Sequence, residues 1–197
     1  MTVESLGIES SNPARYSPQN LAADVESCLN ANDPLEIAQN VLRTVVDAVR
    51  EHPDFLPESV CQPILEKYAR RPLHIDPLGR FSIFAMTWGK GQSTPLHDHG
   101  GLWVAEVLYR GKVAVTDYTY LGELQGLHQF REDETTVAGP GQSSYRVPPD
   151  EHHILANAVE TPSVTIHVFG GVLGQCNSYF PVEGGYQRST LRMRSDS

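Results

Sequence analysis

The chain has few cysteines, no long apolar run and no block of like charge, and each absence excludes a class of protein. Its three cysteines, Cys28, Cys61 and Cys176, are widely spaced and form no Cys-x-x-Cys pair. This pattern differs from that of a disulfide-stabilised secreted domain and suits a reducing compartment. No stretch approaches the roughly 18 apolar residues of a membrane-spanning helix.

The charge balance and the first residues exclude further classes. The formal net charge is −9 and no basic cluster is present, which disfavours binding to nucleic acid. The first twenty residues are polar and lack the basic-then-apolar pattern of a signal peptide. We therefore expect a soluble cytoplasmic protein with no nucleic-acid or membrane partner. A length of 197 residues with 40% hydrophobic content predicts one compact domain.

The first third of the chain has the signals of α-helices. We expect residues 1–16 to form a flexible tail and residues 17–68 to form a helical segment. Ser17-Pro18 and Asp33-Pro34 each place a capping side chain directly before a proline, which is typical of a helix start. Apolar residues then follow at helical spacing. A shorter third helix is predicted over 58–68.

From residue 69 the pattern changes to short β-branched and aromatic runs separated by Gly, Pro and Asp. Many short strands with evenly spaced turns favour a closed or two-sheet β architecture such as the jelly roll. We expect this β-barrel to span residues 69–190, with a flexible tail over 191–197. Strands are predicted at 81–88, 102–109, 112–120, 144–147, 152–158 and 163–169.

The most informative motif is His97-Asp98-His99. Side chains alternate along a strand, so two histidines two residues apart would present both imidazoles on one face. His152 or His153 can supply a third nitrogen donor. Three neutral imidazoles leave the charge of a divalent metal uncompensated, which favours an anionic ligand such as a thiolate. Glu106 is the nearest carboxylate that follows, and we expect it at the surface or behind the ligands.

These segments resemble the two sequence motifs of the cupin superfamily. The second motif, Pro-x-x-x-His-x-x-x-Asn, ends at Asn157 and favours His153 over His152 as the third ligand. Within the cupins, residues 68–169 resemble the thiol dioxygenases of the cysteine dioxygenase type I branch. The resemblance is carried by Tyr68-Ala69-Arg70, Asp76-Pro77-x-Gly79-Arg80-Phe81-Ser82, Trp88-Gly89-x-Gly91, His97-Asp98-His99, Trp103 and Thr165-Ile166-His167.

The resemblance implies a mainly β protein, a cupin jelly-roll barrel with an N-terminal α-helical segment. It further implies Fe(II) held by His97, His99 and His153, with a small thiol and O2 bound at the open positions. Both oxygen atoms are then delivered to sulfur, giving a sulfinic acid. Arg70 lies at the position that holds the substrate carboxylate in the cysteine-specific enzymes, with Tyr68 beside it. Cysteine or a similar short thiol carboxylate is the expected substrate.

One motif departs from the family pattern. The family's Ser-x-His-x-Tyr reads Thr165-Ile166-His167-Val168-Phe169, so the phenol is missing. By resemblance we expect catalytic roles for His167, Thr165 and Tyr68, and contacts to the substrate from Arg70, Tyr68 and Phe169. The missing phenol leaves open a biosynthetic relative that makes a more oxidised or diverted product. Two further alternatives are a three-His hydrolase or isomerase that uses another divalent metal, and a non-catalytic cupin that binds a small acid or a metal.

Overall fold

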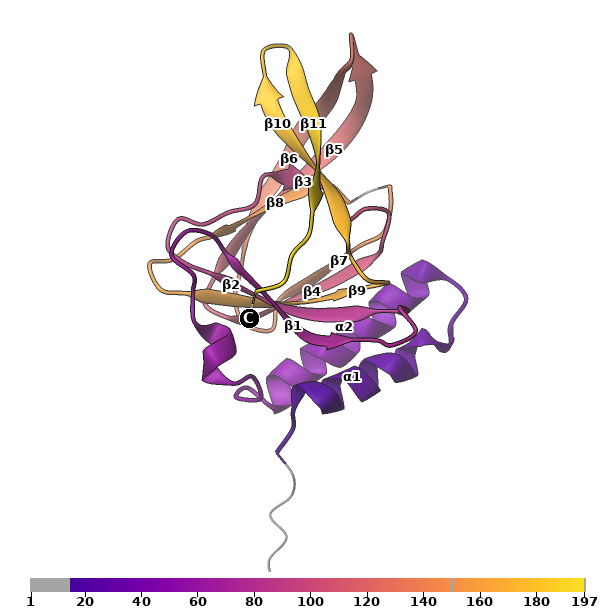
Figure 1. Ribbon diagram of the computed structural model, residues 1–197, viewed down its shortest axis with the longest axis vertical. Helices are drawn as coiled ribbons and strands as arrows, with labels where there is room; N and C mark the ends of the chain where they lie inside the picture. Colours follow the sequence, from indigo (N-terminus) through magenta and orange to yellow (C-terminus); the bar gives the residue numbers. More distant parts are fainter. Residues whose placement is uncertain (1–14, 150, 197) are drawn as a thin grey trace, which may run out of the picture.

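The computed structural model describes residues 15–149 and 151–196, and within them two α-helices precede a β-rich body (Figure 1). The helices are α1 (Pro18–Ser27) and α2 (Pro34–Glu51), with the short 3-10 turn η1 (Cys28–Asn30) between them. Both predicted caps are present, because Ser17 accepts the backbone N–H of Asn20 and Asp33 accepts that of Leu35. Residues 1–14 of the predicted tail lie outside the described residues.

The third predicted helix is shorter than expected. Only the 3-10 turn η2 (Glu58–Cys61) forms in the range 58–68. Gln62 is extended, with φ −77° and ψ 127°. Because Pro63 follows it, the helical region is sterically disfavoured for Gln62, so the turn ends there.

The strands confirm a mainly β protein built from two antiparallel sheets. One sheet has the order β1-β2-β9-β4-β7, and the other is closed in the order β10-β11-β6-β5-β8-β3. The strands missed from sequence, β1, β3, β6, β10 and β11, are polar, interrupted or very short, so they lack the apolar alternation that marks a strand. The bounds are β1 (Ala69–Ile75), β2 (Ser82–Trp88), β3 (Leu96–His97), β4 (Val104–Arg110), β5 (Val113–Leu124), β6 (Leu127–Ala138), β7 (Ser143–Arg146), β8 (His153–Asn157), β9 (Ser163–Phe169), β10 (Gln175–Val182) and β11 (Gly185–Arg192).

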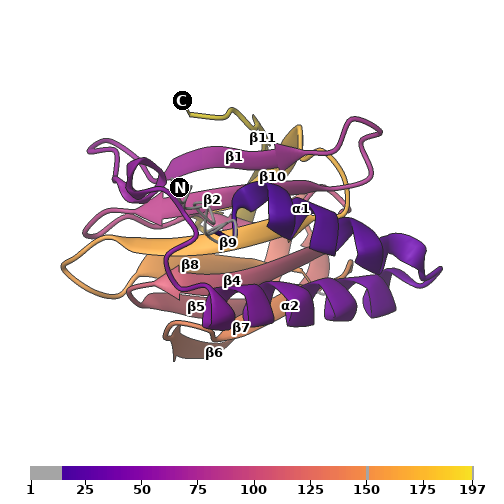
Figure 2. The ribbon, with the colours of Figure 1, turned by 90° about the horizontal axis from the view of Figure 1, so that it is seen from below.

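The five-stranded sheet separates two apolar cores. Helices α1 and α2 cover its outer face (Figure 2), where Ile83 and Ala85 of β2 belong to the same apolar cluster as Val41 and Val45 of α2. The alternate β2 residues, including Phe84, face the barrel interior in the second cluster. Strands β2 and β9 are buried along their whole length because both faces are covered. The barrel interior is therefore closed on this side.

The sequence predicts a flexible tail over 191–197, and the described part of this segment, up to Asp196, makes contacts with the rest of the chain. Strand β11 continues to Arg192, and Asp196 then lies against the backbone of Arg70 on β1. Its carboxylate accepts the Arg70 N–H at 2.9 Å, and its own N–H donates to the Arg70 carbonyl at 2.8 Å. The chain thus returns to the barrel beside β1 (Figure 1).

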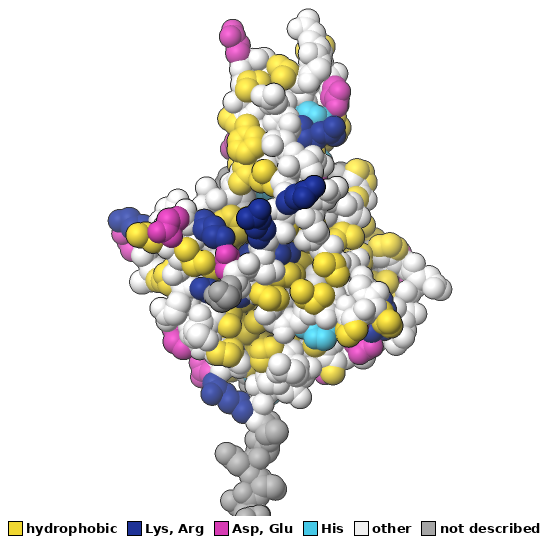
Figure 3. All heavy atoms as spheres, in the orientation of Figure 1, with side chains coloured by type: hydrophobic (Ala, Val, Ile, Leu, Met, Phe, Trp, Pro, Cys, Tyr) yellow, Lys and Arg dark blue, Asp and Glu magenta, His cyan; other side chains and the backbone are white. Residues whose placement is uncertain are grey.

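Charged side chains of both signs lie on the face of the molecule drawn in Figure 3, where they are interspersed with apolar ones. No helix among the described residues has the length and apolarity required to cross a membrane.

Candidate metal centre

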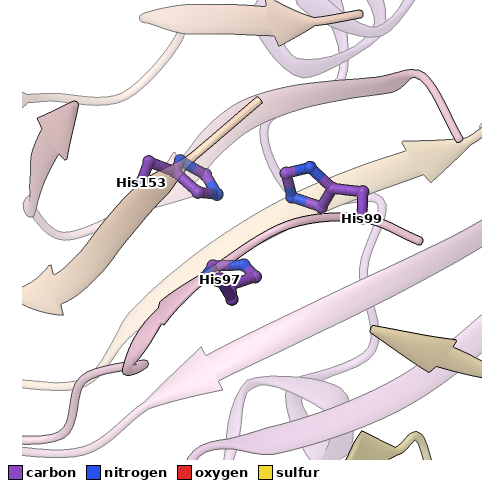
Figure 4. A group of neighbouring side chains, drawn as sticks. All are labelled: His97, His99 and His153. Atoms are coloured by element: carbon purple, nitrogen blue, oxygen red, sulfur yellow. The ribbon is translucent and has the colours of Figure 1, made fainter. Parts of the chain in front are cut away.

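Three histidines from separate parts of the barrel converge on one point (Figure 4). One ring nitrogen from each of His97, His99 and His153 lies within 4.8 Å of the other two. Strand pairing accounts for part of this arrangement, because His97 on β3 is the direct cross-strand neighbour of His153 on β8. The ring centroids of these two are 4.6 Å apart.

His99 reaches the centre by a different route from the one predicted. Strand β3 ends at His97, so alternation along a strand does not align His97 with His99. A loop does so instead, and the Asp98 carboxylate holds it by accepting hydrogen bonds from Asn177 N (2.8 Å), Asn177 Nδ2 (2.8 Å) and Tyr179 Oη (3.1 Å). Burial opposes ionisation of Asp98, but these donors keep its pKa below the ordinary value.

The three rings have the chemistry of metal ligands. Burial, reinforced by His99, lowers the pKa of His97 to about 3, and burial holds that of His153 well below its usual value. Both rings are therefore neutral. His97 Nδ1 lies 3.1 Å from the carbonyl of Pro95, which fixes the hydrogen on Nδ1 and leaves Nε2 as a donor to a metal. His99 Nδ1 and both nitrogens of His153 have no hydrogen-bond partner in the described chain, and buried nitrogens in this condition fit a bound metal.

His152 does not take part in this centre. Its ring packs instead against Tyr120 of β5 and Phe130 of β6, with centroid distances of 5.7 Å and 5.0 Å. His153 is fully buried on the interior side. Side chains of successive residues point to opposite sides of a strand. His153 therefore faces the barrel interior, with His97 and His99, whereas His152 faces Tyr120 and Phe130.

A small cavity of about 50 Å³ opens beside the histidines. Its lining includes Tyr68, Trp88, Phe169 and Cys176 together with His97 and His99. Tyr68 stacks on Trp88 with a centroid distance of 4.7 Å. Burial and the neighbouring Asp98 raise the pKa of Cys176 to about 11, so its thiol is protonated at neutral pH.

Arg70 points into the same interior and is 4% exposed. Its guanidinium carbon lies 3.5 Å from the centroid of the Phe84 ring. Its Nε and Nη2 atoms have no hydrogen-bond partner among the described residues. Burial lowers the pKa of Arg70, but a guanidinium remains a cation near neutral pH. A buried cation with free donors is a site for an anionic ligand.

Glu106 lies behind the histidines, which is the second of the two positions that the sequence left open. It is 6% exposed and belongs to the interior face of β4, where alternate residues Val104 and Leu108 belong to the barrel core. Glu106 Oε1 lies 3.1 Å from His167 Nδ1 and 3.7 Å from His153 Nε2. Burial alone would raise the pKa of Glu106, but the adjacent imidazoles and Arg146 hold it well below the ordinary value. A carboxylate inside the apolar run Trp103–Tyr109 was the signal for a buried charge.

Two consecutive side-chain hydrogen bonds lie beside the centre, one between β2 and β9 and one within β9. Trp88 Nε1 donates to Thr165 Oγ1 at 2.9 Å, and Thr165 Oγ1 lies 2.8 Å from His167 Nε2. The ring of Phe169 is next on the same face of β9, 6.0 Å from that of His167. The predicted residues of the Thr-x-His-x-Phe motif therefore face the interior that holds the three histidines.

The described geometry agrees with a comparison against known protein families. The model of cysteine dioxygenase type I matches residues 61–181, more than half of the chain. The chain belongs to the cysteine dioxygenase type I family. The matched region contains every residue of the predicted centre and excludes α1 and α2.

Solved structures resemble this cysteine dioxygenase family member only in part. The TT1209 protein of Thermus thermophilus is 20% identical, with a TM-score of 0.44, over 58% of this chain and 92% of that one. A Cupin_2 domain of an XRE family transcriptional regulator from Enterobacter cloacae is 17% identical, with a TM-score of 0.40, over 53% and 96%. A double-stranded β-helix domain protein from Klebsiella pneumoniae is 15% identical, with a TM-score of 0.44, over 59% and 84%.

Proposed function

We propose that this chain is a ferrous-iron thiol dioxygenase that acts on cysteine or a closely related short thiol carboxylate. The supporting observation is a buried guanidinium, with donors that have no partner among the described residues, in the same barrel interior as three histidines whose ring nitrogens converge. The Phe169 ring is a neighbour of both groups, with its centroid 6.0 Å from the Arg70 guanidinium carbon and 6.1 Å from the ring of His99. A short molecule with a carboxylate at one end and a thiol at the other has a partner for each group, Arg70 for the carboxylate and the metal for the thiol.

The donor set fits iron. Fe(II) held by His97, His99 and His153 would supply open coordination positions and the redox chemistry that dioxygen requires. The overall reaction, R–SH + O2 → R–SO2H, is balanced. Sulfur provides the electrons that the two oxygen atoms take up, so no further reductant is needed.

The protein side chains bind and orient the substrate. Arg70 forks onto both carboxylate oxygens through its free donors, which fixes one end of the molecule. Tyr68 and Trp88 form a stacked wall of the cavity that limits its length and excludes water. Positioning of this kind supplies much of the rate enhancement when reactants must meet in one geometry.

One observation favours a second product class within the same chemistry. Phe169 is 1% exposed and stands where the family motif has a tyrosine, so no hydroxyl is present at that point of the interior. A product that is more oxidised than the sulfinate, or rearranged, is the alternative outcome.

The test is anaerobic loading with Fe(II), followed by labelled O2 and a panel of thiols. Cysteine, 3-mercaptopropionate and 2-aminoethanethiol separate the need for the carboxylate from the need for the amine. We expect cysteine to consume O2 and to gain both labelled atoms by mass spectrometry. Parallel loading with zinc or manganese should give no oxygen uptake. Absence of thiol-dependent oxygen uptake by the iron-loaded protein would contradict the proposal.

A further inference from the structure

We propose that Glu106 is a positioning residue for His167, with its carboxylate accepting the Nδ1–H and thereby fixing the tautomer and orientation of that ring. The value of this arrangement for turnover rests on the proposed function. The hydrogen-bond assignment itself does not, because it follows from the donors and acceptors around His167.

The direction of the hydrogen bonds around His167 follows from their chemistry. An indole N–H only donates, so Thr165 Oγ1 accepts from Trp88 Nε1 at 2.9 Å. We assign the hydroxyl hydrogen of Thr165 to His167 Nε2, 2.8 Å away, because the reverse direction would leave that buried hydrogen without an acceptor among the hydrogen bonds of the described chain. A neutral imidazole that accepts at Nε2 carries its hydrogen on Nδ1. That nitrogen lies 3.1 Å from Glu106 Oε1.

The strand register places Glu106 for this contact. Glu106 on β4 is directly opposite His167 on β9 and directly opposite Ser144 on β7. Three neighbouring side chains of one sheet therefore line up across its interior face. Phe169 is displaced by two residues along β9 and has no hydrogen-bonding atom, so Glu106 is the acceptor available to His167 Nδ1.

The other oxygen of Glu106 is already engaged. Arg146 Nη1 donates to Oε2 at 3.1 Å, and the Ser144 hydroxyl lies 3.3 Å from the same atom. Arg146 is itself 7% exposed and also binds Asp117 through Nη2. This arrangement fixes the carboxylate and leaves Oε1 without a hydrogen-bond partner in the described chain, 3.1 Å from His167 Nδ1 and 3.7 Å from His153 Nε2. Glu106 is thus held through Oε2 by Arg146 and Ser144, while Oε1 is available to His167.

A second cavity makes the proposal testable by chemical rescue. It measures about 170 Å³ and its lining includes Glu106, His167, Thr165 and Arg146. It is separate from the cavity beside Tyr68 and Cys176, with His167 and Leu155 in the lining of both. A formate ion can therefore approach the position of the Glu106 carboxylate without entering the proposed thiol pocket.

The experiment compares Glu106→Gln and Glu106→Ala with the wild-type protein. The ring nitrogens of His167 are followed by ¹⁵N NMR in the metal-free protein, and assigned by their absence in His167→Asn. We expect one tautomer, with the hydrogen on Nδ1, in the wild type and a mixture in Glu106→Gln, because an amide can either donate or accept. In the iron-loaded Glu106→Ala protein we expect kcat about 10- to 100-fold lower with little change in thiol affinity, and partial recovery on addition of formate.

Glu123→Gln is the matched control. Glu123 is also the carboxylate partner of a histidine, with Oε1 3.5 Å from His128 Nε2, but it lies on the projecting β5 hairpin. This variant should leave the His167 spectrum and kcat unchanged. A single Nδ1–H tautomer that persists in Glu106→Gln would overturn the proposal, as would a loss of kcat in Glu106→Ala that formate cannot restore. A tautomer change without any thiol oxidation by the wild type would instead overturn the proposed function alone.

Discussion

Replacement of Arg70 by glutamine should weaken the binding of cysteine by about two orders of magnitude while metal content stays normal. The Nε and Nη2 atoms of Arg70 are buried and have no partner among the described residues, so both are available to a carboxylate. A hydrogen bond to a charged group contributes roughly 1.5–3 kcal/mol. Two such bonds, partly replaced by the amide of glutamine, amount to about 3 kcal/mol, and each 1.4 kcal/mol is about tenfold in affinity.

The assay measures thiol dissociation constants anaerobically for two substrates and two enzymes. 2-Aminoethanethiol keeps the thiol and the amine of cysteine but lacks the carboxylate. Comparing the loss of affinity for the two thiols between wild type and Arg70→Gln forms a double-mutant cycle, which isolates the contact between Arg70 and the carboxylate. Arg71→Gln serves as the control, because Arg71 Nη1 donates to the carbonyls of Val60 and Gln62 and not into the barrel.

The expected result is a large loss for cysteine and almost none for 2-aminoethanethiol in Arg70→Gln, with both unchanged in Arg71→Gln. Equal losses for the two thiols would refute the reasoning, since Arg70 would then act on the shape of the pocket and not on a carboxylate. Loss of iron in Arg70→Gln would refute it as well.

Three further outcomes can be measured independently. His97→Ala removes one of the three nitrogen donors, and we expect the affinity for iron to fall by more than about a hundredfold. Metal analysis after dialysis measures this loss, and the control variant Leu155→Val should retain iron. Phe169→Tyr adds a hydroxyl at a fully buried position, which should lower the free energy of unfolding by about 1–3 kcal/mol. Mass spectrometry should show a larger fraction of sulfinate among the products. An unchanged product ratio would argue against a role for the missing phenol. Hydrogen bonds from Arg80 lower the pKa of Asp76 in the folded state, so this pair stabilises the fold above about pH 4 and the contribution is lost as the pH falls further. The urea concentrations at the midpoint of unfolding should therefore differ between the wild type and Arg80→Gln at pH 6 and converge in acid. A difference between the two midpoints that does not change with pH would contradict this account.

The local signals in the sequence were sufficient for several elements. The Ser17 and Asp33 caps, the apolar helix stripes and the strands around Phe84 and Ile166 could be predicted because short-range spacing encodes them. Strand β6 could not, because its run from Arg131 to Thr136 is polar and the strand is held by pairing with β5 and not by an apolar face. The C-terminal segment was missed for a related reason, since Asp196 is held by the distant backbone of Arg70.

By itself, the sequence determined the class of fold, the imidazole donors and the resemblance that includes Arg70, because residue type and spacing carry that information. The tertiary structure decided how those groups meet. The Asp98 loop, and not strand alternation, brings His99 to the centre, and long-range pairing of β4, β7 and β9 turns Glu106 toward His167. Pairing between strands far apart in the chain depends on packing over the whole barrel, so no local window of residues contains it.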